Sequence, residues 1–439
     1  MHYFSRSETH MPSLRVMVVG TTSDYIELIR RRDPHRALFL TDPAERARAS
    51  EEAPAQAEEI VCDLTDAEGV LRVLGDHLHR YGLAVDGVAC FDCESLGLAA
   101  RLADQLGLPF PSPSAVALSR NKFLCKDAWK RAEVVCPEVT VARNRSELGK
   151  FLDRVGKSIV LKPLTGSGGE LVFRCESQND CSLAYETMQR RLADAGDNRM
   201  YTQDPLSNGG FDPRRDVVLE EFIPGQEYSC DFFMENGRLE IIRTAMKIPA
   251  AEPELGATAA YVVPAALPEE MPSRLLHDQL QRAATAIGLQ RALCMVDFIV
   301  WQGQAYLLEL TPRPGGDCLP WLIQQSCGLD MIGLALDLAQ GRKISLPPGQ
   351  IWKTMVGLRL FAQHSGEVKH IDDRDLRQDP RVQEVLIKRR VGHRVILPPN
   401  DYDSRLLGHV IFRPSPGISL EVECAEMAGK LKVEMEAQG

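Results

Sequence analysis

The chain has 439 residues, of which 44% are hydrophobic, and a formal net charge of −10. This length suits roughly two to four domains, and the negative charge argues against general nucleic-acid binding. No apolar run is long enough to cross a bilayer, so we expect no membrane contact. The first 13 residues are polar and include a second Met at position 11. We therefore expect a flexible tail over residues 1–13 and leave two alternative start sites open.

Short apolar segments alternate with helical segments in the first quarter of the chain. The apolar segments cover residues 14–20, 37–41, 59–62 and 85–91, and helical patterns cover 66–81 and 94–106. This alternation predicts an N-terminal α/β domain with a parallel sheet over residues 14–116. The turn at residues 20–24 lacks the glycine spacing of a dinucleotide-binding loop. Prolines 109, 111 and 113 mark the end of this region.

Only two of the twelve cysteines, Cys90 and Cys93, have a close spacing. A single C-x-x-C pair is weak evidence for zinc or for a redox motif, because a structural zinc site needs more ligands. The pair lies at the end of a predicted strand, where small buried thiols are common. We therefore expect both cysteines to be dispensable for catalysis and the protein to reside in a reducing cytoplasm.

A glycine-rich loop follows the predicted strand at residues 159–163. Lys162 lies at the end of that strand, and the loop reads Thr165, Gly166, Ser167, Gly168, Gly169. Glycines let backbone N–H groups approach phosphate oxygens, and a nearby lysine adds positive charge. The lysine precedes the glycines, so this is not a P-loop. A glycine-rich hairpin turn would explain the loop equally well, and Lys122, at the start of a predicted helix over 120–131, has a solvated surface lysine as its alternative.

A second polar segment follows the apolar strand at residues 217–219. It contains Glu220, Glu221, Phe222 and Ile223, then a Pro-Gly turn and Glu227. A segment that leaves a strand edge can offer backbone groups to an adenine ring, and a nearby carboxylate can bond to ribose hydroxyls. An ordinary polar hairpin between two strands explains the same residues.

Two predicted strands between residues 297 and 311 are joined by a turn at residues 301–304. This hairpin brings Asp297 and Glu309 to the same end of a sheet. Paired carboxylates suit Mg²⁺, which completes its shell with water and phosphate oxygens. Arg313 follows closely, and its planar fork suits a carboxylate or phosphate. Beyond it, Gly316, Asp317 and Trp321 could line an acceptor pocket, or could form a capped helix start with a buried tryptophan.

The remainder of the chain, residues 344–439, begins with a second linker at prolines 347 and 348. Strand-like segments occur near residues 356–361, 382–388 and 409–412, and we expect a closing helix over 419–436. Together these patterns predict a small C-terminal α+β subdomain.

Taken in order, the lysines, the glycine loop, the 220–227 segment and the 297–313 hairpin resemble the ATP-grasp superfamily. The resemblance covers about residues 14–340, and the tail is similar to the C-terminal subdomain of L-amino acid ligases of that family. It implies a fold of three parts: the N-terminal parallel-sheet α/β domain, an ATP-grasp domain over residues 117–343, and the C-terminal α+β subdomain.

The resemblance also implies a role for each candidate residue. Lys122 and Lys162 would bind the α- and β-phosphates beneath the loop at residues 165–170. The side chain of Glu220 and the backbone of residues 221–223 would hold adenine, and Glu227 would bind ribose. Lys247 is a candidate for the γ-phosphate, with a surface lysine as its alternative.

The same resemblance assigns the metal and the acyl group. Asp297 and Glu309 would ligate Mg²⁺, with Mn²⁺ as an alternative, and Arg313 would stabilise the acyl phosphate. The family places Asn two residues after the metal-binding Glu, whereas this chain has Thr311. A hydroxyl is shorter than an amide, so this departure puts a second metal in doubt.

The implied activity is ATP-dependent ligation of a carboxylate to an amine through an acyl phosphate. The partners would be small-molecule carboxylates and amines, amino acids among them, and the protein could form a homodimer. Two alternatives stay open: a phosphotransferase that releases a stable phosphorylated product, and a regulatory module that binds ATP without catalysis.

Overall fold

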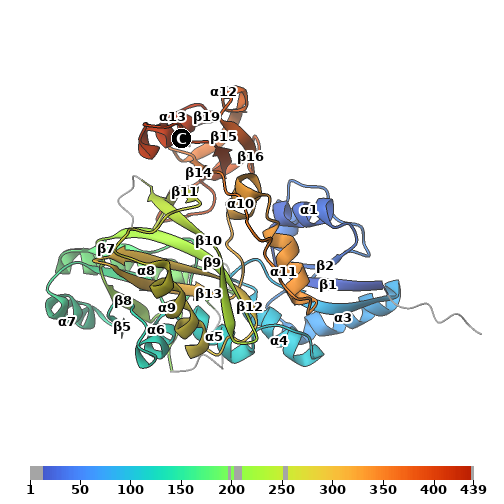
Figure 1. The fold of residues 1–439 in the computed structure, drawn as a ribbon, viewed down its shortest axis with the longest axis horizontal. Coiled ribbons are helices and arrows are strands. Elements are labelled where there is room, and N and C mark those ends of the chain that lie inside the picture. Colours follow the sequence, from blue (N-terminus) through green and yellow to red (C-terminus); the bar gives the residue numbers. More distant parts are fainter. Residues whose placement is uncertain (1–12, 196–198, 202–209, 251–255, 437–439) are drawn as a thin grey trace, which may run out of the picture.

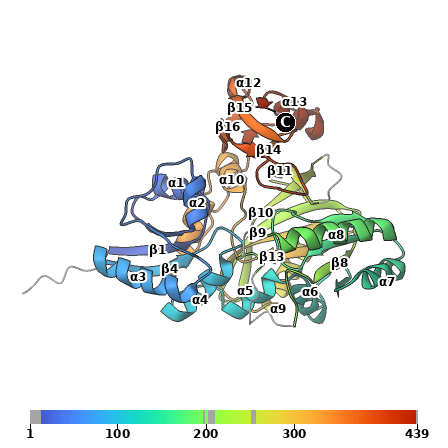
Figure 2. The same ribbon diagram turned by 180° about the vertical axis from the view of Figure 1, so that it is seen from behind.

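The computed structural model describes residues 13–195, 199–201, 210–250 and 256–436. The tail expected over residues 1–13 therefore lies, except for its last residue, outside the described residues. Figures 1 and 2 show two groups of elements at opposite ends of the molecule, with the C-terminal elements above and between them. No helix of the described ranges is long and apolar enough to cross a membrane.

The N-terminal elements form a four-stranded sheet whose strands are all parallel, as the alternating pattern predicts. Its strand order is β3-β2-β1-β4. The strands are β1 (Ser13–Val19), β2 (Ala37–Thr41), β3 (Glu59–Val61) and β4 (Leu83–Ala89). The helices are α1 (Ser23–Arg32), α2 (Pro43–Arg48), α3 (Ala67–Tyr81) and α4 (Leu96–Leu106).

A second four-stranded sheet, antiparallel and in the order β5-β8-β6-β7, carries the glycine-rich loop between β6 and β7. Its strands are β5 (Val139–Ala142), β6 (Ile159–Pro163), β7 (Phe173–Cys175) and β8 (Val217–Glu221). The helices of this region are α5 (Pro113–Arg120), α6 (Lys122–Arg131), α7 (Arg145–Val155) and α8 (Gln178–Ala193). Helices α7 and α8 share one apolar core with this sheet.

An eight-stranded antiparallel sheet forms the centre of the molecule, in the order β13-β12-β9-β10-β11-β14-β18-β16. Five strands come from the central region: β9 (Gln226–Glu235), β10 (Arg238–Pro249), β11 (Thr258–Val263), β12 (Ala292–Trp301) and β13 (Gln304–Thr311). Three come from the C-terminal region: β14 (Met355–Phe361), β16 (Val382–Ile387) and β18 (Leu406–Phe412). The sheet is therefore continuous across the linker expected near residue 347.

The rest of the C-terminal region forms a small three-stranded sheet in the order β17-β15-β19. Its elements are β15 (Gly366–Asp372), β17 (Arg394–Val395) and β19 (Lys432–Glu436), with α12 (Arg374–Gln378) and α13 (Leu420–Gly429). The closing helix expected over residues 419–436 is wrong in its second half. The helix ends at Gly429, and the last residues pair antiparallel with β15.

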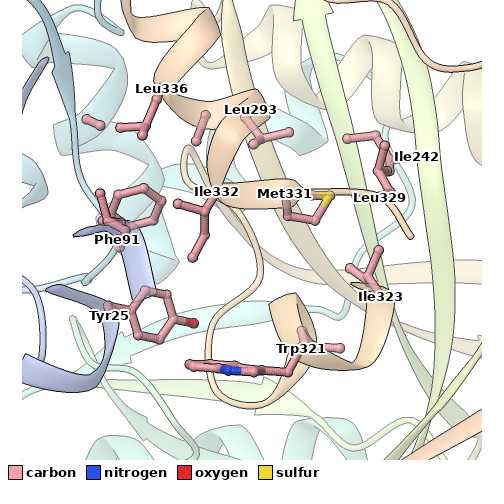
Figure 3. Close-up of a cluster of buried hydrophobic side chains, with 14 of the residues drawn as sticks. Tyr25, Phe91, Ile242, Leu293, Trp321, Ile323, Leu329, Met331, Ile332 and Leu336 are labelled. Atoms are coloured by element: carbon pink, nitrogen blue, oxygen red, sulfur yellow. The ribbon is translucent and has the colours of Figure 1, made fainter. Parts of the chain in front are cut away.

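The two faces of the eight-stranded sheet have different cores. On one face, even-numbered residues of β9 pack with α6 and α9 (Ser273–Ala286). On the other face, an apolar cluster joins α10 (Leu319–Cys327) and α11 (Met331–Ala339) to side chains of the N-terminal sheet. Figure 3 shows Trp321, Ile332 and Leu336 of these two helices next to Tyr25 and Phe91. The N-terminal elements are thus anchored on the second face.

Candidate active site

The predicted hairpin is formed by β12 and β13, and its two carboxylates lie opposite each other. Asp297 and Glu309 are direct partners in the strand register. Gln302 and Gly303 form the turn with φ of 49° and 70°, a left-handed pair that tightens a two-residue hairpin loop. Directly paired residues point to the same face of a sheet. The hairpin therefore presents both carboxylates on one face, as the sequence predicts.

Asp297 carries an oxygen that suits a cation. Its Oδ2 is 3.1 Å from Lys247 Nζ, and Lys247 also pairs with Glu227. Its Oδ1 is buried and has no hydrogen-bond partner within the described residues. Burial raises the pKa of Asp297 to about 6, against the opposing pull of Lys247. A bound metal would supply the missing partner for Oδ1 and favour the ionised carboxylate.

Glu309, which lies opposite Asp297, is also surrounded by lysines. Its Oε2 is 3.7 Å from Lys122 Nζ. Burial acts to raise the pKa of Glu309, but the charges of Lys122 and Lys162 hold this pKa below its ordinary value. In the parts of the chain that the structure describes, no cluster of three or more His, Cys, Asp or Glu could hold a metal. Two carboxylates alone fit Mg²⁺, which takes its remaining ligands from water and phosphate.

A buried ion network holds Lys162, one of the two lysines expected at the phosphates. Glu220 is 1% exposed and bridges Lys162 and Lys126, with Oε–Nζ distances of 2.8 and 2.7 Å. Burial acts to raise the pKa of Glu220, but the charges of Lys126 and Lys162 lower this pKa to about 2. The carboxylate of Glu220, which was expected to contact adenine, is therefore already paired with two lysines. Sequence reasoning missed Lys126, whose position on helix α6 gives no sign that it is fully buried.

The glycine-rich loop approaches Lys122 and a second glycine segment. The Nζ of Lys122 donates to the carbonyl of Gly166 at 3.0 Å. A Cβ on Gly169 would lie 2.3 Å from the carbonyl of Gly256, so only glycine allows this approach. Thr165 donates its hydroxyl to the carbonyl of Met200 at 2.9 Å. Gly168 and Gly169 both have positive φ, which gives the loop the left-handed turns that glycine adopts without strain.

Residues 222–225 connect two different sheets. Strand β8 belongs to the four-stranded antiparallel sheet and β9 to the eight-stranded sheet, and the two do not pair. The polar hairpin weighed as the alternative is therefore wrong for this segment. The N–H groups of Glu221 and Phe222 donate to the carbonyls of Glu138 and Ser158, which fixes the crossing. The segment expected to contact adenine therefore lies where the chain passes from one sheet to the other.

Arg313 is held by a residue far away in the chain. Its Nη2 and Nε lie 3.0 and 3.2 Å from Sγ of Cys93, and its Nη1 donates to the carbonyl of Pro314 at 2.7 Å. Cys93 belongs to the N-terminal region, so the guanidinium spans the boundary between two parts of the molecule. The sequence assigns Cys93 to packing, and nothing in its spacing signals this contact.

A fully buried ion pair holds the loop that follows Arg313 in place. Arg243 contacts Asp231 at 2.7 Å, and both side chains are 0% exposed. Asp231 also accepts the N–H of Gly315 at 2.8 Å. A Cβ on Gly315 would lie 2.9 Å from Arg243 and 3.1 Å from Asp231, so glycine is needed there. The pair therefore sets the path of residues 313–317.

The other residues predicted for the metal and the acceptor pocket lie in different environments. Asp317 adopts a left-handed backbone with φ of 58° and pairs with Arg359 at 2.8 Å. Trp321 lies in the apolar cluster between Tyr25 and His409, each with its ring centre 5.2 Å away. Gly316 lies beside Arg313, and Thr311 ends β13 on the same face as Glu309. Trp321 is thus a buried core residue, which is the alternative that the sequence offered for it. Its ring also contacts the ring of His409.

The arrangement combines four lysines, two paired carboxylates and one half-buried arginine at the meeting of two antiparallel sheets. Lysines and a metal can neutralise a triphosphate, and an arginine beyond them can hold an oxyanion. The geometry suits phosphoryl transfer to an acceptor that lies next to Arg313.

Comparison with known proteins agrees with this geometry. Residues 155–320 match the ATP-grasp domain family. An uncharacterized protein of Sinorhizobium fredii is 24% identical over 88% of this chain and 75% of its own length. Carnosine synthase 1 of Homo sapiens is 24% identical over 63% of this chain, which spans only 33% of that relative. The crystal structure of L-amino acid ligase from Bacillus licheniformis has a TM-score of 0.79 and 18% identity, covering 98% of this chain and 100% of that one. This likeness shows the fold.

Proposed function

We propose that this chain, which has an ATP-grasp fold with the domain matched over residues 155–320, is an ATP-dependent ligase that joins a carboxylate to an amine. The observation that carries the proposal is the placement of Arg313 four residues after Glu309, directly beyond the end of β13, with its guanidinium held by Cys93. A half-buried guanidinium directly beyond a metal-binding hairpin can stabilise the acyl phosphate and the tetrahedral species derived from it. Structural similarity to an amino acid ligase and sequence similarity to carnosine synthase support the same reaction.

The residues present fit both ATP and Mg²⁺. Lys122 and Lys162 converge on Glu309, and Lys247 adjoins Asp297, so positive charge surrounds the expected triphosphate. Residues 222–225 would hold adenine between the two sheets, and Glu227 would bind ribose once it exchanges Lys247 for a hydroxyl. Bound Mg²⁺ would neutralise charge on the transferred phosphoryl group. Mn²⁺ suits the same oxygen ligands.

The reaction divides into two steps that balance. First, a carboxylate oxygen of the substrate attacks the γ-phosphorus, the bond to the β-phosphate oxygen breaks, and ADP leaves. Second, the amine attacks the acyl carbon, phosphate leaves with the bonding electrons, and the nitrogen loses a proton. Arg313 holds the oxygens of the acyl phosphate in both steps, while the loop at residues 165–170 excludes water, which would hydrolyse it.

The test separates the first step from the second. Hydroxylamine intercepts an acyl phosphate as a hydroxamate, so the protein with ATP, Mg²⁺ and a panel of carboxylates should give hydroxamate and ADP without any amine substrate. Glu309→Ala should lower this rate by roughly 100-fold or more, because removal of a metal ligand costs at least as much as removal of its supporting groups. Glu240→Ala, an exposed carboxylate on β10, is the matched control and should retain activity.

Two results would contradict the proposal. ATP-dependent formation of a stable phosphorylated alcohol, with no hydroxamate, would make the protein a phosphotransferase. ATP binding with no substrate-dependent release of ADP would make it a regulatory module.

A homodimer and a cytoplasmic location complete the proposal. The second is supported by all twelve cysteines being free thiols, as a reducing compartment keeps them.

A further inference from the structure

A cavity lies where the N-terminal sheet, the linker at residues 109–111 and the central sheet meet. It has a volume of about 50 Å³ and is lined by residues of β4, β12 and α11, together with residues 109–111 and 312–314. Figure 3 shows Leu293 of β12 beside Leu336 of α11 at this junction. Arg313, the arginine expected at the acyl phosphate, is therefore itself part of the cavity wall.

The cavity wall is built from small residues and rigid segments. Four of its residues are alanines that are at most 8% exposed: Ala89, Ala292, Ala335 and Ala339. Four more are prolines, at positions 109, 111, 312 and 314. A proline ring fixes its own backbone φ, so these segments cannot easily move to close the space that the alanines leave. Protein interiors are otherwise close-packed, which makes an apolar cavity next to a reacting group a specific feature of this fold.

The charges on the cavity wall are all positive. Among the described residues that line the cavity, Arg291 and Arg313 are charged, and none is an aspartate or a glutamate. An ammonium group placed there would lose its water shell without gaining an anionic partner, which costs free energy. The cavity therefore suits an uncharged chain that carries a carboxylate at the end next to Arg313.

The cavity adjoins the end of the metal-binding hairpin. Strand β13 ends at Thr311, which pairs with Met295 of β12, and the next three residues line the cavity. Met295 lies midway between Asp297 and the wall residue Leu293, and alternate residues of a strand share a face. Leu293 is therefore on the face of the metal-binding carboxylates, about 13 Å along the strand from Asp297 at roughly 3.3 Å per residue. An acid activated beside Asp297 and held by Arg313 is close enough to place its chain in the cavity.

The volume of the cavity limits the group that can enter it. An apolar cavity of roughly 150 Å³ takes up benzene. The cavity beside Arg313, at about 50 Å³, is much smaller and does not suit an aromatic ring. A short aliphatic chain is narrower than a ring, and its burial against alanine and leucine side chains is favourable.

We propose that this cavity binds the chain of the carboxylic acid that ATP activates, and that it selects a short, uncharged aliphatic chain. The reacting carboxylate lies at Arg313, on the cavity wall, and the chain extends between β4, β12 and α11. Ala335 and Leu338 of α11 determine the permitted length of the chain. This inference rests on the proposed ligase function and adds to it the class of acid that the protein accepts.

The experiment uses hydroxylamine trapping with ATP and Mg²⁺ on two series of acids. One series runs from acetate to hexanoate, and the other consists of the α-amino acids with the same chains, so that a requirement for an amino group next to the carboxylate cannot hide the effect of length. We expect kcat/KM for hydroxamate to rise by roughly tenfold or more for each added methylene until the chain fills the cavity, and then to fall. Rates that do not depend on chain length in either series would overturn the inference.

A charge at the end of the chain provides the second comparison. Exchange of the terminal methyl group for an ammonium group keeps the shape, as in pentanoate and γ-aminobutyrate, or norvaline and α,γ-diaminobutyrate. The charged acid of each pair should react roughly 100-fold or more slowly, because the cavity wall offers the ammonium group no anionic partner. Equal rates within a pair would place the end of the chain in water and overturn the inference. Absence of hydroxamate with every acid would instead refute the proposed function itself, and this inference with it.

Variants then assign the preference to the cavity. Ala335→Leu fills part of the space and should lower kcat/KM for the acid that the wild type prefers by roughly tenfold or more relative to the shortest acid that reacts. Leu338→Ala enlarges the space and should shift the preference to a longer chain, so one variant still tests the inference if the other fails to fold. Ala425→Leu, at an exposed position of α13, is the matched control and should keep the wild-type order of acids. An equal loss with every acid in both cavity variants would mean a structural role and overturn the assignment.

Discussion

The guanidinium of Arg313 has a fixed orientation that a lysine cannot reproduce. Two of its nitrogens face the Cys93 thiol and the third donates to a backbone carbonyl. Although burial acts against its charge, the nearby Cys93 thiol and the Tyr25 hydroxyl raise the pKa of Arg313. The group is therefore permanently charged and rigidly placed. A lysine would keep the charge and lose the planar fork.

Arg313→Lys should lower turnover by roughly 100-fold or more while ATP affinity stays near normal, because the lost contact is made mainly during acyl transfer. Calorimetric ATP affinity and hydroxamate formation are the two measurements. Arg374→Lys, at an exposed site, serves as the control. An equal loss of affinity and turnover would place Arg313 on the nucleotide, and full retention of turnover would remove it from the catalytic residues.

His409 should make the protein sensitive to mild acid. Its pKa is lowered by burial to about 4 in the folded state, whereas the ordinary value is 6.5. The unfolded chain therefore binds a proton first as the pH falls. The stability that the neutral ring contributes is complete above pH 6.5 and is lost as the pH falls towards 4, by roughly 3 kcal/mol in all.

Urea unfolding at pH 7 and pH 5 tests this expectation. The free energy of unfolding should fall more in the wild type than in His409→Gln, because glutamine has no proton to gain. The comparison between the two proteins cancels the titration of groups that lie far from His409. Parallel loss of stability in both would show that His409 does not titrate on unfolding.

Local pattern predicts some site residues well and others not at all. Asp297 and Glu309 are predictable because a short hairpin fixes their pairing from nearby residues alone. Cys93 lies 220 positions from Arg313, so only the folded structure can reveal their contact. Lys126 has the same sequence signature as an exposed helical lysine, and its burial depends on Glu220 in another sheet.

The strands of the N-terminal sheet and the β12–β13 hairpin are predicted correctly because their apolar periodicity and turn residues act locally. One error and one rejected alternative concern long-range pairing. The segment at residues 432–436 forms a strand because β15, about sixty positions earlier, supplies its hydrogen bonds. The hairpin considered for the step from β8 to β9 does not form, because β8 pairs with β5 and β6 whereas β9 pairs with β10 and β12.

The crossing between β8 and β9 depends on Gly225. A Cβ on this residue would lie 2.2 Å from the carbonyl of Val300 and 2.6 Å from Ile299, so the segment must shift to accommodate it. Gly225→Ala should lower the free energy of unfolding by roughly 1–3 kcal/mol and weaken ATP binding, because the shifted segment is the expected adenine contact.

Gly75→Ala is the matched control for this change. Gly75 lies within helix α3, and a Cβ there meets nothing within 4 Å. Alanine should be neutral or stabilising by roughly 0.5–1 kcal/mol at such a site. Chemical denaturation and ATP titration of both variants decide the question. A Gly225→Ala protein with wild-type stability and affinity would contradict the tight crossing.

At the scale of the whole molecule, one apolar cluster joins the three parts of the chain. It contains Phe91 of the N-terminal region, Leu293 of the central sheet, and Ile332 of α11. It also reaches Met355 and Ile411 in the C-terminal strands. Polar contacts add to it at the edge, where Arg36 bonds to Gln340. A Cβ on Gly87 would lie 2.5 Å from the carbonyl of Ala339, so β4 and α11 are in close contact.

This shared core predicts that the three parts unfold together. Ile332 is 1% exposed, and Ile332→Ala should leave a cavity in the junction and cost roughly 2–5 kcal/mol. Ile351→Ala removes the same atoms at a site that is 80% exposed and should cost little.

Scanning calorimetry should give a single transition for the wild type and for Ile351→Ala, and a transition at lower temperature for Ile332→Ala. The candidate active site contains residues on both sides of the junction, Cys93 and Arg313 among them, so activity should be lost in the same transition. Two separate transitions in the wild type, with activity surviving the first, would mean that the N-terminal region folds and melts on its own and that Cys93 is not needed to hold Arg313.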